Sequence, residues 1–295
     1  MEFRGLMGGL YRISEWIMRF SAINVLWVIC SSPVLIGGFF IWTSPAMFED
    51  PNLASSFIRT IILYCAILSP FTLFPATAAM FAVARKWVMG DTDVALLKTY
   101  FRSYKENYKQ SMFSGLFFVL LSVLLYVNYT FYLRQSGTLS LLSVLFVVLA
   151  FILAAAVLHH FSIMVHFHMK FWQIVKNSFL ITIGNPVMTI FLLVCSGIIL
   201  YVSLTKFTFL IPFFMASLIA FVSFWTFYRI YDRMKTLTEK KEQENEAEES
   251  NDEENNDEEE RTDRETDKPD SPAGLPSADG QKPGDRGKKE QDRAR

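Results

Sequence analysis

Long apolar stretches separated by short polar segments run through most of the chain. Six of them are long enough, or nearly so, to cross the ~30 Å hydrocarbon core of a bilayer as helices. They cover residues 20–42, 57–84, 112–133, 139–165, 187–205 and 207–228. The pattern predicts an all-α protein, a polytopic transmembrane helical bundle of about six spans arranged as three hairpins.

The second stretch is longer than the ~20 residues that a perpendicular helix needs. It contains Pro70 and Pro75, and each proline removes a backbone donor and disfavours a straight helix. We therefore expect a break near Leu73 and Phe74, with Pro75 starting a new helical piece. A half-helix that begins at Pro75 and Thr77 could offer free backbone donors to a ligand. A packing kink without a ligand is the commoner alternative.

Amphipathic, aromatic-rich segments precede the hairpins and are expected to be cytoplasmic lead-in helices. Residues 1–19 form the first, an interfacial helix rather than a cleavable signal. The clearest covers residues 99–111, where aromatic residues share one helix face beside a basic stripe. The stripe consists of Lys98, Arg102, Lys105 and Lys109. We expect it to attract anionic lipid headgroups, with a protein partner as the alternative.

Lys and Arg are distributed unevenly among the polar segments. Alternate segments, beginning with the first, hold sixteen cations up to Lys241, whereas the opposite set holds only Arg59, Arg134 and Lys206. Because cytoplasmic loops are enriched in Lys and Arg, both termini are predicted to be cytoplasmic. The last two spans are separated by little more than Lys206, so we expect a tight hairpin, with a re-entrant pair as the alternative.

The chain changes character after Thr238. Its net charge is +9 through that residue and −10 over residues 239–295. Few apolar side chains remain in this tail to offset the entropy of ordering, so it is predicted to be disordered. The expected organisation is an interfacial helix at 1–19, a transmembrane helical domain at 20–238 and a disordered charged cytoplasmic tail at 239–295.

Residues that could carry chemistry are sparse. The six stretches contain no Asp or Glu, although coupled transporters usually keep an intramembrane carboxylate. Phosphate-binding GK[ST] loops, GxSxG nucleophile turns and HExxH metal helices are all missing from the sequence. The three cysteines lie in apolar runs without CxxC spacing. We expect no enzymatic activity, no cofactor, no metal and no nucleic-acid partner.

Two kinds of polar residue inside the stretches remain candidates for function. His159 and His166 lie seven residues apart on one helix face, which would suit a metal or pH-sensing cluster. Interfacial histidines that hydrogen-bond neighbouring helices are the commoner alternative. Asn24, like the hydroxyl side chains within the spans, is expected to join helices by hydrogen bonds.

Several motifs resemble the bacterial YesL family. The first is the segment 7–17 (MGGLYRISEWI), followed by Asn24-Val-Leu-Trp27 and Pro33. The second is the segment 74–87 (FPATAAMFAVARKW), followed by 88–93 (VMGDTD). The chain departs from the family pattern through the added length of residues 43–70 and the acidic tail.

The resemblance implies a plasma-membrane protein, typical of Gram-positive bacteria, whose relatives are often encoded beside carbohydrate-uptake transporters and their sensor systems. It carries no biochemical activity over to any residue. Our hypothesis is a non-enzymatic accessory or regulatory protein linked to carbohydrate uptake, with the bilayer and a membrane transporter or sensor protein as partners. The alternative is a small-molecule permease with a path along the broken second span.

Overall fold

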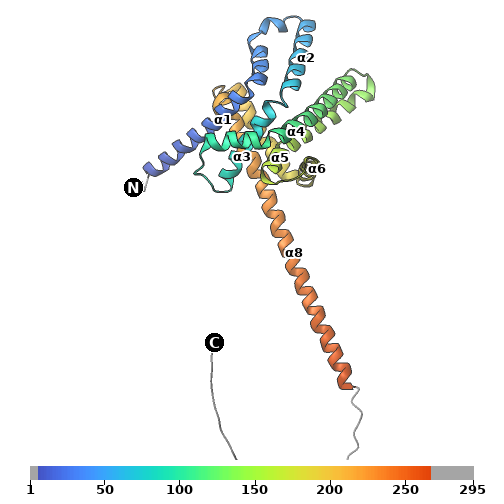
Figure 1. Ribbon diagram of the computed structural model, residues 1–295. Helices are drawn as coiled ribbons and strands as arrows, with labels where there is room; N and C mark the ends of the chain where they lie inside the picture. Colours follow the sequence, from blue (N-terminus) through green and yellow to red (C-terminus); the bar gives the residue numbers. More distant parts are fainter. Residues whose placement is uncertain (1–5, 267–295) are drawn as a thin grey trace, which may run out of the picture. The chain divides into compact units, whose positions relative to one another are not determined.

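This computed structural model describes residues 6–266, which fold into helices joined by turns and short loops (Figure 1). The main helices are α1 (Leu6–Thr43), α2 (Pro51–Leu68), α3 (Leu73–Val88), α4 (Leu96–Leu133), α5 (Leu142–His166), α6 (Phe171–Gly184), α7 (Pro186–Thr205) and α8 (Ala216–Thr266). Short turns precede three of them, namely η1 (Pro45–Phe48), η2 (Gly137–Leu141) and the π-helical turn η3 (Ile211–Met215). The chain divides into two units, one ending at Thr236 and one beginning at Leu237.

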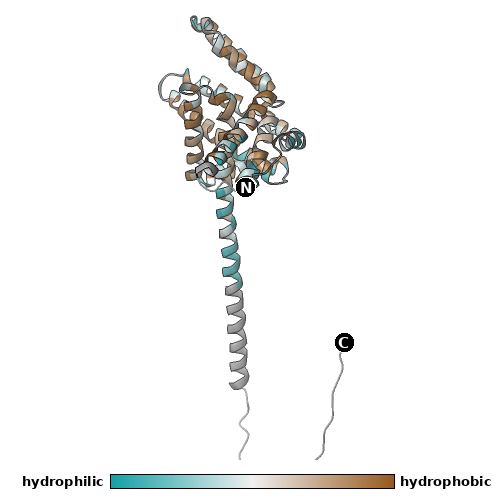
Figure 2. Ribbon diagram, turned by 90° about the vertical axis from the view of Figure 1, so that its left-hand side faces the viewer, coloured by the Kyte–Doolittle hydropathy of each residue, from teal (hydrophilic) through white to brown (hydrophobic). Residues whose placement is uncertain are grey.

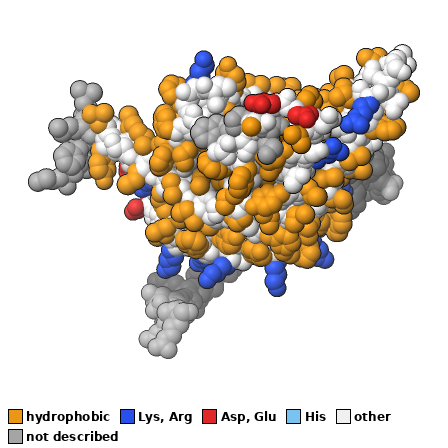
Figure 3. All heavy atoms as spheres, turned by 90° about the horizontal axis from the view of Figure 1, so that it is seen from above, with side chains coloured by type: hydrophobic (Ala, Val, Ile, Leu, Met, Phe, Trp, Pro, Cys, Tyr) orange, Lys and Arg blue, Asp and Glu red, His pale blue; other side chains and the backbone are white. Residues whose placement is uncertain are grey.

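Within residues 6–266, six helices are long and apolar enough to span a membrane, which confirms the predicted fold class. They are α1, α2, α4, α5 with its leading turn η2, α7, and α8 with its leading turn η3. Apolar residues dominate these helices in Figure 2, except in α8, which becomes hydrophilic after its first turns. Hydrophobic side chains also cover most of the face in Figure 3, with Lys and Arg side chains toward its edges. An apolar exterior of this kind is suited to lipid rather than water.

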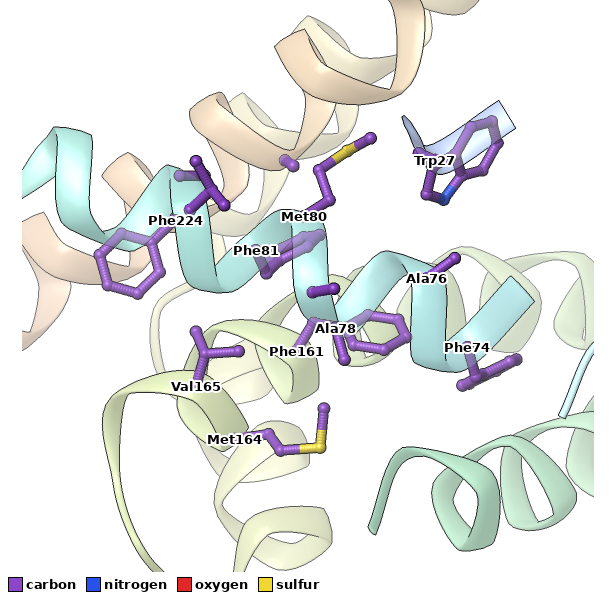
Figure 4. Close-up of a cluster of buried hydrophobic side chains, with 14 of the residues drawn as sticks. Trp27, Phe74, Ala76, Ala78, Met80, Phe81, Phe161, Met164, Val165 and Phe224 are labelled. Atoms are coloured by element: carbon purple, nitrogen blue, oxygen red, sulfur yellow. The ribbon is translucent and has the colours of Figure 1, made fainter. Parts of the chain in front are cut away.

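The remaining two helices, α3 and α6, are too short to span. The α3 helix has 16 residues, of which ten are buried. It packs mainly against α4, α1 and α5. Ala76, Ala78 and Ala79 are fully buried on α3, and their small side chains let neighbouring helices approach closely. Figure 4 shows α3 at the centre of the core, with side chains from α1, α5 and α8 around it.

The break in the second apolar stretch is present in the structure. The α2 helix ends at Leu68, and a turn over residues 69–72 leads into α3. The new helical piece begins at Leu73 rather than at Pro75, so the predicted starting residue is corrected by two positions. The first amides of a helix have no carbonyl partner within the helix, so Pro75, which has no amide hydrogen, is tolerated in that turn.

The α1–α2 hairpin is held by a few close contacts. The Tyr64 hydroxyl donates a 2.6 Å hydrogen bond to the Pro33 carbonyl, and the Tyr64 ring lies against Gly37. No residue of α2 is buried. The helix therefore presents most of its apolar surface to the bilayer or to another membrane protein.

The lead-in segments differ from the expected separate helices. Leu6–Thr43 is one helix of 38 residues, so no boundary falls at residue 19. The second lead-in is likewise continuous with its span, since α4 also has 38 residues. Only the segment before the third hairpin forms a separate helix, α6, because α6 ends at Gly184 and Pro186 starts α7. The α7 and α8 helices are distinct and are joined through a short turn, as a hairpin requires.

The tail also differs from expectation. The α8 helix extends to Thr266, so residues 239–266 are helical where disorder was predicted. Glu accounts for 12 of the 28 residues of this segment, and its high helix propensity favours a solvated helix. Polarity alone does not distinguish such a helix from a disordered chain. The rest of the predicted tail, residues 267–295, lies outside the described residues.

Candidate functional site

Asn24 connects the first span to the start of the last one. Its side chain is fully buried. Its Nδ2 donates to the Ile211 carbonyl at 2.9 Å, while its Oδ1 accepts from the backbone amides of Ala216 at 2.9 Å and Ser217 at 3.0 Å. These groups belong to η3 and the first turn of α8, where the π-helical turn departs from regular α-helical pairing. Asn24 therefore holds this irregular turn from a distant part of the chain.

Thr77 belongs to a second join, between α1 and α3. Its hydroxyl accepts a 3.0 Å hydrogen bond from the Trp27 indole and donates to the Leu73 carbonyl at 2.7 Å. Trp27 lies one helical turn after Asn24, so consecutive turns of α1 hold α8 and α3. Together, Asn24, Trp27 and Thr77 form what we term the polar joint.

The start of α3 satisfies most of its own backbone donors. The Phe74 amide donates to the Ser69 carbonyl at 3.0 Å, and the Ala76 amide donates to the Thr72 carbonyl at 3.1 Å. Pro75 is buried and has no amide hydrogen. This arrangement favours a packing break over a ligand site made from a free helix terminus.

Substitution of Pro75 tests this interpretation. Pro75→Ala should change the free energy of unfolding by less than about 1 kcal/mol, because alanine fits the first helical turn and adds one donor near the Ser69–Thr72 turn. Membrane abundance and thermal stability of the purified variant provide the measurement. Normal abundance together with failure to restore growth on a substrate that a deletion strain cannot use would instead indicate a functional break. The double variant Pro70→Ala, Pro75→Ala would extend the comparison to both prolines.

The four histidines lie in different environments. His159 is fully buried, and neither of its ring nitrogens has a hydrogen-bond partner among the described residues. His166 is half-buried among aromatic rings of α8, with its ring centroid 5.1 Å from that of Tyr231. His168 is exposed. Within residues 6–266, no group of three or more His, Cys, Asp or Glu side chains is placed to hold a metal ion.

His160, rather than His159 or His166, makes hydrogen bonds to neighbouring helices. It is fully buried, its Nε2 lies 2.7 Å from the Ser114 hydroxyl of α4, and its Nδ1 lies 3.4 Å from the Ser178 hydroxyl of α6. Three helices are therefore linked through one imidazole. The sequence carried no signal for this role, because Ser114 and Ser178 become neighbours of His160 only through helix packing.

The basic stripe lies apart from the polar joint and the histidines. Lys98, Arg102, Lys105 and Lys109 share one exposed face at the start of α4. Arg102 is paired with Glu106 at 2.8 Å. The same face carries Leu97 and Phe101, which are 62% and 46% exposed. The candidates thus form two buried structural clusters and one exposed basic, apolar surface.

Comparison with known proteins gives this chain a family. Residues 20–129 match the family described as protein of unknown function, DUF624. The chain is 28% identical to uncharacterized protein YteU of Bacillus subtilis (strain 168) over 75% of its own length and 84% of that protein. It is 27% identical to YesL of the same organism over 82% and 99% of the two chains.

A third relative is also from Bacillus subtilis (strain 168). It is uncharacterized protein YesV, 31% identical over 50% of this chain and 71% of that protein. No solved structure matches. The family match includes the polar joint and the basic stripe, whereas the histidines of α5 lie outside it. The chain belongs to the DUF624 family of membrane proteins, together with YesL, YteU and YesV.

Proposed function

We propose that this protein is a non-enzymatic accessory or regulatory component of a bacterial plasma membrane, with both termini in the cytoplasm. It would serve carbohydrate uptake by binding a transporter or a sensor protein. The carbohydrate context is supported only by the resemblance to a family whose members are often encoded beside sugar transporters.

The observation that carries the proposal is the filled centre of the bundle. The axis is occupied by α3, whose buried residues pack against three other helices. The hollows within residues 6–266 include one between α4 and α5, one among α5, α6 and α8, one on the face of α4 and one between α1 and the start of α4. None of these four is lined by α3 or by the turn before it. A permease with a path along the broken second span would need polar or open space there, so this arrangement favours the accessory role.

The surface of α2 supports a role in binding. Its 18 residues include none that is buried, and the helix packs mainly against α1 and η1. Leu63 is 62% exposed on this helix. Apolar helix faces of this kind can pack against the helices of another membrane protein by van der Waals contact.

Affinity capture with a photo-crosslinking residue at Leu63 tests the proposed function. The tagged protein would be crosslinked in native membranes, solubilised gently and analysed by mass spectrometry. We expect a transporter or sensor protein crosslinked in stoichiometric amount, whereas a crosslinker at Leu120 of α4 (68% exposed) provides the matched lipid-facing position. Crosslinks to lipid alone, together with sugar flux through the isolated protein, would contradict the proposal.

The proposed sidedness makes a separate prediction. Reporters fused after Asp91, Lys176 and Lys240 should read as cytoplasmic, and a reporter fused after Asp50 should read as external, because sixteen Lys/Arg lie on one set of segments against three on the other. Paired phosphatase and fluorescent-protein fusions provide the measurement. A cytoplasmic reading at Asp50 would overturn the proposed topology.

A further inference from the structure

Two adjoining hollows lie where α1 passes the start of α4. The first has a volume of about 740 Å³ and is lined by Met18, Ala22, Val25 and Leu26 of α1 and by residues 95–98. The second has a volume of about 530 Å³ and is lined by Leu97, Lys98, Phe101, Arg102 and Lys105. Leu97 and Lys98 line both hollows, so the two form one continuous surface.

The two hollows differ in chemistry. Apart from Lys98, every side chain that lines the first hollow is apolar. The second holds three cations beside two apolar side chains. Within the described residues, an ion pair is found for Arg102 but for neither Lys98 nor Lys105. An amphiphile with an anionic head and an apolar chain would fit both, with its head at the cationic hollow and its chain in the apolar one.

Trp16 indicates where the first hollow begins. It is half-buried and lies two residues before Met18 on α1. Because Trp is typical of the boundary between headgroups and hydrocarbon, the first hollow starts near that boundary. From Met18 to Leu26 the first hollow follows α1 for about 12 Å into its apolar stretch. Its length and position suit part of an acyl chain.

We propose that these two hollows bind one anionic phospholipid of the cytoplasmic leaflet. Lys98 and Lys105 bind its phosphate, and one acyl chain lies along Met18, Ala22 and Leu26. The side of the membrane follows the proposed function above, whereas the site itself does not depend on sidedness. The site differs from general attraction of the basic stripe to a charged surface, since an acyl groove selects a single lipid and holds it in a defined place.

Lipid retention by the purified full-length protein tests the site without a partner or a membrane side. The protein in nonionic detergent would be titrated with dioleoyl phosphatidylglycerol or dioleoyl phosphatidylcholine and examined by native mass spectrometry. We expect one tightly retained phosphatidylglycerol per chain. Lys98→Gln with Lys105→Gln should weaken its binding by about 10- to 25-fold, from about fivefold for each cation.

Matched variants separate this site from charge alone. Lys176→Gln with Lys206→Gln removes the same charge from exposed positions elsewhere and should leave phosphatidylglycerol binding unchanged. Ala22→Phe should fill the apolar hollow and weaken lipid binding, whereas Ala150→Phe, on α5, should not. Thermal stability of each variant checks that it is folded.

Three outcomes would overturn the proposal. They are equal retention of both lipids, equal weakening by the two lysine pairs, and displacement of the lipid by soluble glycerol 3-phosphate, which would indicate a free phosphate site. None of them bears on protein partners, so the lipid site and the accessory function can fail separately.

Discussion

Gly115→Ala is expected to destabilise the bundle by about 1–3 kcal/mol, although it adds a single carbon atom. A Cβ atom on Gly115 would lie 2.7 Å from the Cα of Pro70 and 3.0 Å from the Phe74 ring. Because the nearest atom belongs to the backbone, relief requires α4 to move away from the turn that precedes α3. Gly115→Leu should prevent stable folding.

Gly197→Ala provides the matched control for this effect. Gly197 is also helical, in α7, but an added Cβ would meet no atom within 4 Å. Alanine should therefore be neutral there, or stabilising by up to about 1 kcal/mol through its helix propensity. Thermal unfolding of the two purified variants in the same detergent gives the comparison. Equal melting temperatures would show that α4 does not approach Pro70 as closely as described.

Asn24→Ala is expected to cost about 3 kcal/mol, since three buried or half-buried backbone groups lose their hydrogen bonds to its side chain at once. These are the Ile211 carbonyl and the amides of Ala216 and Ser217. Pro212 supplies no amide of its own, and η3 already departs from regular α-helical pairing. No water enters the hydrocarbon region to replace the lost bonds.

Asn128→Ala distinguishes this role from a general effect of removing an asparagine. Asn128 is also in a spanning helix, but its Nδ2 donates to the Leu124 carbonyl, one turn earlier in the same helix, and to no other group in the part of the chain that the structure describes. Its loss should change stability by less than about 1 kcal/mol. Thermal unfolding and resistance to proteolysis near residues 206–216 provide the measurements. If both variants were equally stable, Asn24 would not hold the start of α8.

The spans could be predicted because a bilayer imposes strong rules on sequence. Every backbone group must be paired within hydrocarbon, so apolar length alone identified six helices. The break at Pro70 and Pro75 was predicted for a similar reason, since proline cannot complete the helical pairing. Length did not reveal that α3 would become the buried centre of the bundle. Its apolar composition is equally suited to lipid and to a protein core.

The polar contacts were only partly predictable. Asn24 could be identified as a helix-joining residue, but its partners lie 187 to 193 positions away and no local pattern indicates them. The role of His160 was not predicted, because helical spacing favoured His159 and His166 as the candidate histidines. The helical part of the tail was missed since charge and hydropathy describe solvation, whereas the helix depends on the propensity of its residues.

Sugar flux through the protein alone tests the accessory role most directly. Purified full-length protein would be reconstituted in liposomes that contain phosphatidylglycerol, and uptake of radiolabelled mono- and disaccharides would be followed beside protein-free vesicles. Because α3 fills the centre of the bundle, we expect uptake equal to that of protein-free vesicles for every sugar tested. Saturable uptake of any one sugar, lost on Pro70→Ala with Pro75→Ala, would contradict the account and establish a permease instead.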